Sequence, residues 1–543
     1  MTNIEQRIAG EWGVIADMVR EHAADRPDAP AVIDPNGRLT WRELDARMDR
    51  VAAALQRDGI QPQQAIAICA QSSTDYVAVF LGALRAGVAV APLSPGSTPE
   101  SFARMVGDAQ ASLLFIDAAS LAAATMVPRE DVRFIGLDAM PSAPARPTST
   151  FVDPDEGAVV TPDETARVAS PFPSFADWLA PEGARPVEVR PERDWPFNII
   201  YSSGTTGAPK GIVQPHGMRW THVQRGGSHG YGANSVSLLS TPLYSNTTLV
   251  VFFPTIAFGG CVILMPKFDA GEYLRLAERH RVTHTMLVPV QYRRLMARPD
   301  FDSYDLSSFV AKFCTSAPFA AEVKADVVAR WPGSLVEFYG MTEGGGTCIL
   351  LAHDHPTKLH TVGQPAEGSD IRLIDEDGKE VPRGESGEVV GSSAGMMTGY
   401  HRQPEKTREA EWFDAAGKRF IRTGDVGRFD DDGFLTLFDR KKDLVISGGF
   451  NIYPSDLEAV LRAHPGVADV AVVGVPSTDW GETPVAFVVP AAGDATAGDV
   501  LLAWANAQLG KTQRLAQLHF IDELPRSAIG KVLKRELRDL LRR

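Results

Sequence analysis

The chain has 543 residues, more than one hydrophobic core ordinarily organises, so we expect several domain-sized units. Its 54 Lys and Arg residues against 68 Asp and Glu residues give a formal net charge of −14. This balance argues against nucleic acid or an acidic membrane as a partner, because both require a basic surface.

The first hundred residues alternate between helix and strand patterns. Thr40 and Glu43 have capping-box spacing and open a predicted helix that ends at Gly59. A buried strand is predicted at 65–70, and a helix and a second strand at 75–95. This alternation predicts a mainly parallel sheet covered by helices. The first residues do not form a basic and then apolar leader, and no apolar run approaches the roughly 18 residues of a spanning helix. We therefore expect a cytoplasmic protein without a membrane span.

The rest of the chain divides into segments of different character. Residues 141–194 are rich in Pro, Ala and acidic residues and predict a long surface connection with one short helix at 175–179. The strand–helix alternation returns at 198–332, and a Gly-rich β region follows at 363–433. We predict an α/β fold with two domains: a large body of layered sheets plus the β region at 1–439, and a small α+β domain at 440–543. The four cysteines form no CxxC pair and are expected to be buried free thiols: Cys69, Cys261, Cys314 and Cys348.

A flexible, polar loop interrupts two β-branched runs in the stretch "IIYSSGTTGAPKGIV" at 199–213. Phosphate oxygens need many N–H donors at close range, and this loop offers glycines, hydroxyl groups and one lysine. It is not a Walker A loop, because a strand pattern rather than a helix follows it. A plain hairpin tip is the alternative interpretation. The candidate phosphate-binding residues are Ser202, Ser203, Gly204, Thr205, Thr206, Gly207 and Lys210.

Five ordered motifs resemble those of the adenylate-forming superfamily, which includes acyl-CoA synthetases, nonribosomal adenylation domains and firefly luciferase. They are "YSSGTTGAPKG" at 201–211, "FYGMTEG" at 338–344, "RTGDVG" at 422–427, "DRKKDLVISGGFNIYPSDLE" at 439–458 and "PRSAIGKVLKREL" at 525–537. The resemblance implies that a carboxylic acid attacks the α-phosphate of ATP to give an acyl adenylate and pyrophosphate, and that a thiol then displaces AMP. Because the first step brings two anions together, fixed positive charge and oriented donors should dominate catalysis.

The resemblance assigns roles to individual residues. Lys531 reaches the cleft of the main body and holds carboxylate and phosphate oxygens, Thr342 contacts the α-phosphate, and Glu343 binds Mg²⁺. Asp425 accepts the ribose hydroxyls with Arg440 as its companion. Lys442 is the hinge about which the small domain turns between the two half-reactions. The nucleotide wall is expected to comprise Ser316, Ala317, Pro318, Glu337, Phe338, Tyr339 and Gly340, and a pantetheine tunnel Gly448, Gly449 and Phe450.

The acid pocket is expected to be larger than acetate needs. Acetate-activating relatives have a tryptophan where this chain has Gly340, and Gly344, Gly345 and Gly346 are expected to add room on the same side. Many relatives have a histidine where this chain has Ser245, so the pocket gains hydrogen-bonding groups from Tyr244, Ser245 and Asn246. We expect an aromatic or medium-chain acid, since apolar walls favour each buried methylene by about 0.8 kcal/mol.

The leading functional interpretation is an ATP-dependent carboxylic acid–CoA ligase that uses ATP, Mg²⁺ and coenzyme A. One alternative is an adenylation enzyme that loads the phosphopantetheine of a carrier protein. Another, of a different class, is a non-catalytic nucleotide-binding protein, which the joint presence of Thr342, Glu343, Asp425 and Lys531 disfavours. A homodimer is left open, and a lysine acetyltransferase acting on Lys531 would remove the charge that the first step needs.

Overall fold

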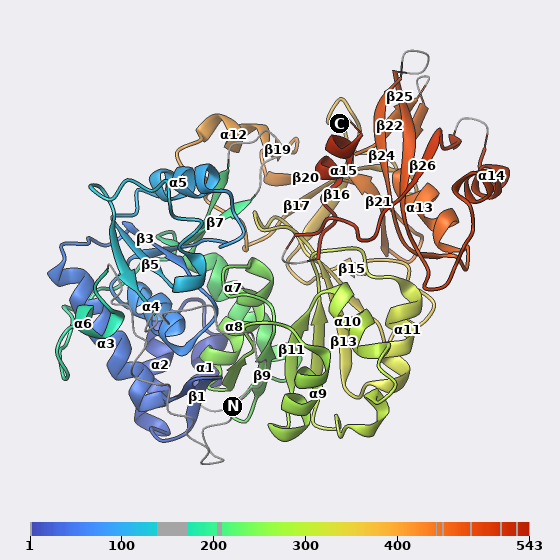
Figure 1. The fold of residues 1–543 in the computed structure, drawn as a ribbon. Helices are drawn as coiled ribbons and strands as arrows, with labels where there is room; N and C mark the ends of the chain where they lie inside the picture. The colour runs from blue at the N-terminus through green and yellow to red at the C-terminus, as the bar shows by residue number, and fades with distance from the viewer. Residues whose placement is uncertain are drawn as a thin grey trace.

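Figure 1 shows the computed structural model of the chain, which describes residues 3–137, 172–202, 209–440, 443–447, 450–477, 481–510, 513–527 and 530–541. Two helix-covered sheets form most of the N-terminal part, a smaller β region joins them, and the last hundred residues form a separate sheet with its own helices. The predicted α/β fold class is confirmed. The predicted division at 439/440 stays a prediction.

The first sheet has seven strands in the order β18-β8-β7-β4-β3-β5-β6. Neighbours from β7 to β6 run parallel, whereas β8 and β18 are antiparallel additions at one edge. Its strands are β3 (Ala65–Cys69), β4 (Ala89–Pro92), β5 (Leu113–Ile116), β6 (Arg133–Gly136), β7 (Pro196–Ser202), β8 (Lys210–Pro215) and β18 (Gly399–Tyr400). The predicted phosphate loop therefore connects the antiparallel strands β7 and β8.

The second sheet has nine strands in the order β15-β14-β13-β12-β11-β9-β10-β1-β2. Its six inner strands, from β13 to β1, run parallel. The strands are β1 (Pro30–Asp34), β2 (Gly37–Thr40), β9 (Val236–Leu239), β10 (Cys261–Leu264), β11 (His284–Leu287), β12 (Ala311–Cys314), β13 (Ser334–Tyr339), β14 (Cys348–Leu351) and β15 (Gln364–Pro365). The parallel strands place their carboxyl ends along one edge, where ligands bind in open α/β sheets.

Helices fill the space between the two sheets. The largest hydrophobic core joins residues of both sheets to several helices, among them α2 (Ile15–Asp25), α3 (Trp41–Arg57), α4 (Thr74–Arg85), α7 (His216–Gly226) and α8 (Asn246–Ala257). The predicted capping box is confirmed, because the Thr40 side chain accepts from the Glu43 N–H and the Glu43 carboxylate accepts from the Thr40 N–H. The predicted short helix is also present as α6 (Phe175–Trp178). All four cysteines are buried and unpaired, as expected.

Other helices cover the outer faces of the two sheets. They are α5 (Pro99–Asp108) beside the first sheet, and α9 (Ala270–Arg279), α10 (Pro289–Met296) and α11 (Ala321–Arg330) beside the second. A short helix α1 (Asn3–Ala9) begins the described chain, and α12 (Pro404–Glu409) follows β18. No helix in these described ranges is long and apolar enough to cross a membrane.

The β region lies between the sheets and the C-terminal part. It pairs its strands antiparallel in the order β16-β17-β20-β19, with β21 beside β20. The strands are β16 (Asp370–Ile374), β17 (Gly387–Ser392), β19 (Glu411–Phe413), β20 (Arg419–Phe429) and β21 (Leu435–Arg440).

The C-terminal part forms a five-stranded sheet in the order β23-β22-β25-β24, with β26 beside β25. Its elements are β22 (Val445–Ser447), β23 (Phe450–Ile452), α13 (Pro454–Arg462), β24 (Val467–Ser477), β25 (Gly481–Pro490), α14 (Gly498–Gln508), β26 (Gln517–Phe520) and α15 (Lys534–Leu540). The strand at 485–489 and the helix near 499–509 were predicted. This part has its own buried core, and one turn of it contacts the main body at α10.

Candidate functional site

The predicted nucleotide-wall residues lie where two neighbouring parallel strands end. Ser316, Ala317 and Pro318 follow the carboxyl end of β12, and Gly340 follows that of β13. Ser316 adopts a positive φ of 83°, which is uncommon for a residue with a side chain. Its hydroxyl lies 2.5 Å from the hydroxyl of Thr247 on α8, so a hydrogen bond fixes the turn against the helix.

A tyrosine on β13 holds a carboxylate of the β region. The Tyr339 hydroxyl donates to Asp425 Oδ2 at 2.9 Å, and the Asp425 N–H donates to the Thr423 hydroxyl at 3.0 Å. Burial and the neighbouring carboxylate raise the pKa of Tyr339 well above its usual value, so it remains a donor at neutral pH. In the β20–β21 ladder Asp425 is opposite Arg440. The two predicted ribose residues are therefore neighbours in the backbone.

A second tyrosine–carboxylate pair involves Glu343, in the segment that follows β13. Tyr400 of β18 donates from its hydroxyl to Glu343 Oε1 at 2.8 Å. The Lys210 ammonium lies 5.0 Å from the centre of the same ring, a cation–π distance. Tyr400 thus brings together the predicted metal ligand and the lysine at the end of the predicted phosphate loop. Tyr400 belongs to none of the motifs recognised in the sequence and was not predicted.

A chain of buried amides lies beneath Thr342. Gln214 of β8 donates to the Thr342 carbonyl oxygen at 2.6 Å and to Asn246 Oδ1 at 3.3 Å. Its own carbonyl oxygen accepts from Asn198 at 3.0 Å and from the Arg219 guanidinium. These bonds fix the main chain of the residue predicted to contact the α-phosphate. The part that Gln214, Asn198 and Arg219 play in the site was not predicted either, because none of these residues belongs to a motif.

The two other residues expected in the pocket beside Asn246 make different contacts. The Tyr244 hydroxyl hydrogen-bonds to Ser94. Ser245 is 8% exposed, precedes α8, and its carbonyl oxygen accepts from the N–H groups of Thr248 and Leu249. Of the three, the side chain of Asn246 is the one that joins the amide chain below Thr342.

The four glycines expected to enlarge the acid pocket play two different roles. A Cβ atom at Gly340 would lie in ordinary contact with the Gly346 carbonyl oxygen at 3.5 Å and Thr347 Oγ1 at 3.7 Å, so a small side chain would fit there without a clash. In contrast, a Cβ at Gly344 would clash with the Gly395 carbonyl oxygen, and one at Gly346 with the Ile371 side chain. A Cβ at Gly345 would lie 2.9 Å from the Gly391 carbonyl oxygen. The expectation that Gly344, Gly345 and Gly346 add room is therefore wrong. Their small size permits close packing against the β region.

The side chain of Glu337, which was predicted to contact the nucleotide, instead forms an ion pair inside the fold. Its carboxylate is 4% exposed and forms an ion pair with the Lys324 ammonium, which also donates to the carbonyl oxygens of Leu359 at 2.7 Å and Thr361 at 3.1 Å. Burial raises the pKa of Glu337, and the nearby ammonium opposes that shift. We therefore correct the prediction for this side chain: it supports the strand. Its neighbour Phe338 packs edge-on to His229, with ring centres 5.8 Å apart.

Lys531 is exposed and follows a tight turn of the C-terminal part. The Ser527 N–H donates to the Lys531 carbonyl oxygen at 2.8 Å, and Gly530 has a φ of 76°, which favours glycine. A Cβ at Gly530 would lie 3.1 Å from Val290 Cγ1 and 3.7 Å from Val288 Cγ2. The turn that bears Lys531 therefore packs against the segment that follows β11, at the edge where the predicted nucleotide wall is found.

Several predicted residues lie outside the described part of the chain. They are Ser203, Gly204, Thr205, Thr206, Gly207, Lys442, Gly448 and Gly449. The side chains of Ser202, Arg440 and Phe450 are likewise not described.

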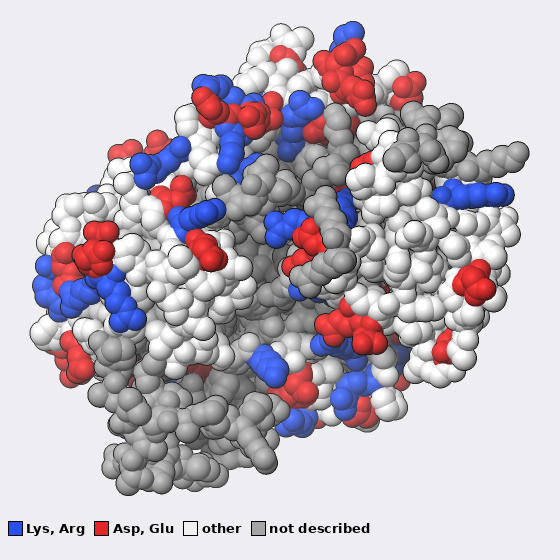
Figure 2. All heavy atoms as spheres, turned by 45° about the horizontal axis from the view of Figure 1, so that its top comes forward, with Lys and Arg blue, Asp and Glu red and all other residues white. Residues whose placement is uncertain are grey.

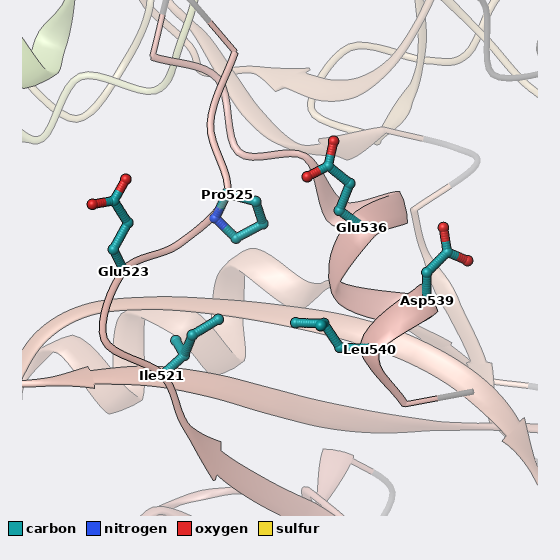
Figure 3. A pocket seen from close by; sticks show the side chains of 6 residues that line it. All are labelled: Ile521, Glu523, Pro525, Glu536, Asp539 and Leu540. Atoms are coloured by element: carbon teal, nitrogen blue, oxygen red, sulfur yellow. The ribbon is translucent and has the colours of Figure 1, made fainter. Parts of the chain in front are cut away.

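Surface charge and a surface hollow help to delimit the site. Figure 2 shows Lys, Arg, Asp and Glu interspersed over one face, without a broad basic patch. A hollow of about 360 Å³ on the C-terminal part is lined by Ile521, Glu523, Pro525, Glu536, Asp539 and Leu540 (Figure 3). Three carboxylates around this hollow make it unsuitable for phosphate groups.

Comparisons with known proteins agree with this arrangement. Residues 19–401 match the model of the AMP-binding enzyme family, and residues 456–531 match the model of the AMP-binding enzyme C-terminal domain. A feruloyl-CoA synthase of Amycolatopsis sp. is 32% identical over 535 residues, covering 97% of this chain and 98% of the relative. The 4-coumarate–CoA ligase 2 of Oryza sativa subsp. japonica is 33% identical over 534 residues, covering 95% and 90%. The solved structure of the amide bond synthetase McbA from Marinactinospora thermotolerans has a TM-score of 0.80 at 27% identity, covering 97% and 99%.

Proposed function

The chain belongs to the AMP-binding enzyme family and is an AMP-forming acid–CoA ligase, and we propose that its acid substrate is aromatic. The observation that supports the proposed site is the convergence of two tyrosine-held carboxylates, Asp425 and Glu343, around the end of β13. The turn before Lys531 docks at the same edge of the sheet. Nucleotide, acid and catalytic lysine would meet there.

In the first half-reaction a carboxylate oxygen of the acid forms a bond to the α-phosphorus of ATP, and the bond to pyrophosphate breaks. Lys531 and the hydroxyl of Thr342 would stabilise the negative charge that develops on the phosphoryl oxygens. Gln214 supports this role, because its 2.6 Å hydrogen bond holds the Thr342 carbonyl in place. Asp425, oriented by Tyr339, would accept the ribose hydroxyls.

We propose that Glu343 contributes one carboxylate ligand to Mg²⁺. In the described residues no group of three or more His, Cys, Asp or Glu side chains is arranged to hold a metal. This donor set suits Mg²⁺, which takes one or two protein carboxylates together with phosphate oxygens and water. When bound, the ion would neutralise charge on the departing pyrophosphate. Tyr400 would orient Glu343 for this role.

In the second half-reaction the thiol of coenzyme A attacks the acyl carbon and AMP leaves. The proposal assigns Lys442 as the hinge that turns the C-terminal part, and Gly448, Gly449 and Phe450 as the pantetheine channel. A phosphopantetheinyl carrier protein is the alternative thiol. A non-catalytic nucleotide-binding protein is the alternative of another class, and the two oriented carboxylates disfavour it.

Three observations support an aromatic acid over acetate. Gly340 carries no side chain at the end of β13, Phe338 offers a ring two residues before it, and the relatives quoted above are named for feruloyl-CoA and 4-coumarate. Aromatic rings bury a large apolar area and stack favourably on other rings. A medium-chain acid is the second candidate.

The deciding experiment measures each half-reaction separately. Acid-dependent exchange of labelled pyrophosphate into ATP should occur with arylpropenoic or benzoic acids and should be weak with acetate. Thioester formation should then require coenzyme A. If no acid in a broad panel supports exchange, the assignment as a ligase is wrong. If only a carrier protein or an amine accepts the acyl group, coenzyme A is not the acyl acceptor.

Two further expectations belong to this proposal. Acetylation of Lys531 would suppress the first half-reaction, because it removes the charge. A homodimer and a cytoplasmic location remain predictions from the sequence.

A further inference from the structure

Two arginines of α7 form hydrogen bonds inside the main body, and one of them reaches Thr347 beside Gly340. Arg219 is fully buried, and its guanidinium donates to Asn198 Oδ1 at 3.0 Å and to the Gln214 amide oxygen. Arg225, six residues further along the helix, is half-buried and donates to Thr347 Oγ1 at 3.3 Å. Thr347 Oγ1 is the atom that would lie 3.7 Å from a Cβ at Gly340. The Arg225 guanidinium therefore borders the proposed acid pocket.

Two imidazoles complete this group. His222 Nδ1 lies 3.5 Å from Arg219 Nη1, and His229 stands edge-on to Phe313 and Phe338 at 5.2 and 5.8 Å between ring centres. Burial, and then the positive charge of the neighbouring arginines, lowers the pKa of both histidines. Both are therefore neutral at physiological pH and can serve as hydrogen-bond donors rather than as counter-ions.

No carboxylate neutralises these arginines within the described residues. Neither Arg219 nor Arg225 forms an ion pair with an Asp or Glu there, and burial alone lowers the pKa of each guanidinium. Other buried cations are satisfied by the fold: Arg85 contacts Asp45 at 2.6 Å and Asp49 at 2.8 Å, and Lys312 donates to three backbone carbonyl oxygens. A partly buried charge without a counter-ion is costly, so the position of Arg225 beside Thr347 and Gly340 points to a ligand that supplies the missing charge.

We propose that the acid substrate carries a second carboxylate, remote from the one that is activated, and that Arg225 binds it with help from Thr347, His222 and His229. The proposal rests on the ligase function above and narrows its substrate class to aryl dicarboxylic acids. Among the described residues Arg225 donates to Thr347, one of the five hydrogen bonds that a guanidinium can make, and its planar fork matches a carboxylate with two parallel bonds. A phenol or methoxy group could accept a hydrogen bond there but would not neutralise the charge.

The polar network also explains how the two ends of such a substrate would be positioned. From Thr342, beside the proposed α-phosphate, bonds run through Gln214 to Arg219 and then to His222. Burial and then the charges of Arg219 and Arg225 lower the pKa of His222, so Arg225, which donates to Thr347, is linked to the same network. The activated carboxylate would lie at the Thr342 end and the second carboxylate at the Arg225 end.

The test compares acids that differ at one group. For benzoate, phenylacetate and phenylpropenoate skeletons, a ring carboxylate is compared with a methyl and with a hydroxyl group at the same meta or para position. In the wild-type enzyme we expect kcat/KM for the best diacid to exceed that of its methyl analogue by at least about tenfold. Arg225→Gln should lower kcat/KM for the diacid by about 100-fold, as for loss of one partner of a buried charge pair, and should leave the methyl acid unchanged or improved.

Controls separate recognition from folding. Arg225→Lys should retain part of the preference, and Arg190→Gln, which removes an exposed positive charge, should retain all of it. The thermal midpoint of Arg225→Gln should match that of the wild type. If methyl or hydroxyl acids are better substrates than every diacid, or if Arg225→Gln lowers all acids equally, the second-carboxylate proposal is overturned while the ligase function stands. If no acid is activated at all, it is the ligase function that fails.

Discussion

Lys324 and Arg225 are both held inside the main body, but they differ in what faces their charge. Lys324 is 1% exposed, forms an ion pair with Glu337 and donates to two carbonyl oxygens. Arg225 is less buried, has no carboxylate beside it among the described residues and donates to one threonine hydroxyl. The first cation is satisfied by the fold itself. The proposal above leaves the second cation to be neutralised by the substrate.

The difference separates a structural cation from a recognition cation. Removing a structural cation should destabilise the protein and leave the chemistry of the folded enzyme intact. Removing a recognition cation should leave the stability unchanged and impair substrate binding. Lys531 extends the comparison, because it is exposed and belongs to the C-terminal part, and so its loss should affect one half-reaction and not stability.

The largest expected effect is on stability. Lys324→Met at pH 8 should lower the free energy of unfolding by about 3–5 kcal/mol, because it leaves the buried Glu337 carboxylate without its partner. Urea unfolding followed by tryptophan fluorescence measures this. The double variant Lys324→Met/Glu337→Leu should recover most of the loss. A double variant no more stable than the single one would show that the ion pair is not the cause.

The next effect is on catalysis alone. Lys531→Ala should reduce acid-dependent pyrophosphate exchange by at least about 100-fold, the magnitude for one oriented donor to a developing oxyanion. Thioester formation from supplied acyl adenylate should change little, and the unfolding midpoint should not move. Arg535→Ala, an exposed cation of α15, is the matched control. Equal loss in both half-reactions would contradict the assignment of Lys531 to adenylation.

A smaller effect concerns pH. Burial raises the pKa of Glu337 from 4.5 to about 7, so the folded state binds a proton that the unfolded state releases. This contribution to stability is complete below about pH 4.5 and is lost as the pH rises through 7, with a slope of at most about 1.4 kcal/mol per pH unit. Glu337→Gln should remove this slope from a series of urea unfolding curves. An unchanged slope would assign the titration to another group.

The smallest effect should come from one hydroxyl group. Tyr339→Phe removes the hydrogen bond to Asp425 and should raise the KM for ATP about tenfold, as for loss of one hydrogen bond to a charged group. Tyr400→Phe is the matched control, because it removes the equivalent bond to Glu343. That control should alter the dependence of the rate on Mg²⁺ concentration instead. If both variants alter the KM for ATP alike, the two carboxylates do not have separate roles.

Local patterns in the sequence predicted much of the fold. The capping box at Thr40 and Glu43, the short helix at Phe175–Trp178 and the strands around the loop at 203–208 depend on residues close together in the chain. The family resemblance supplied the site residues, whose roles remain predictions.

The sequence could not indicate contacts between residues far apart in the chain. Tyr400 and Glu343 are separated by 57 residues, and Arg225 and Thr347 by 122. A lone tyrosine or arginine outside a motif is normally read as part of a core or a surface. The ion pair of the Glu337 side chain was likewise not visible in the sequence, because its partner Lys324 comes from a neighbouring helix.

The three glycines at 344–346 let one side of the proposed acid pocket pack closely against the β region, since added side chains would collide with the main chain at 391 and 395 or with Ile371. That side is consequently rigid and tolerates almost no substitution. We expect a change of substrate preference, by selection or by design, to proceed through other positions. Gly340, where a small side chain fits, would adjust the length of the pocket, and Arg225 would discriminate between charged and neutral acids.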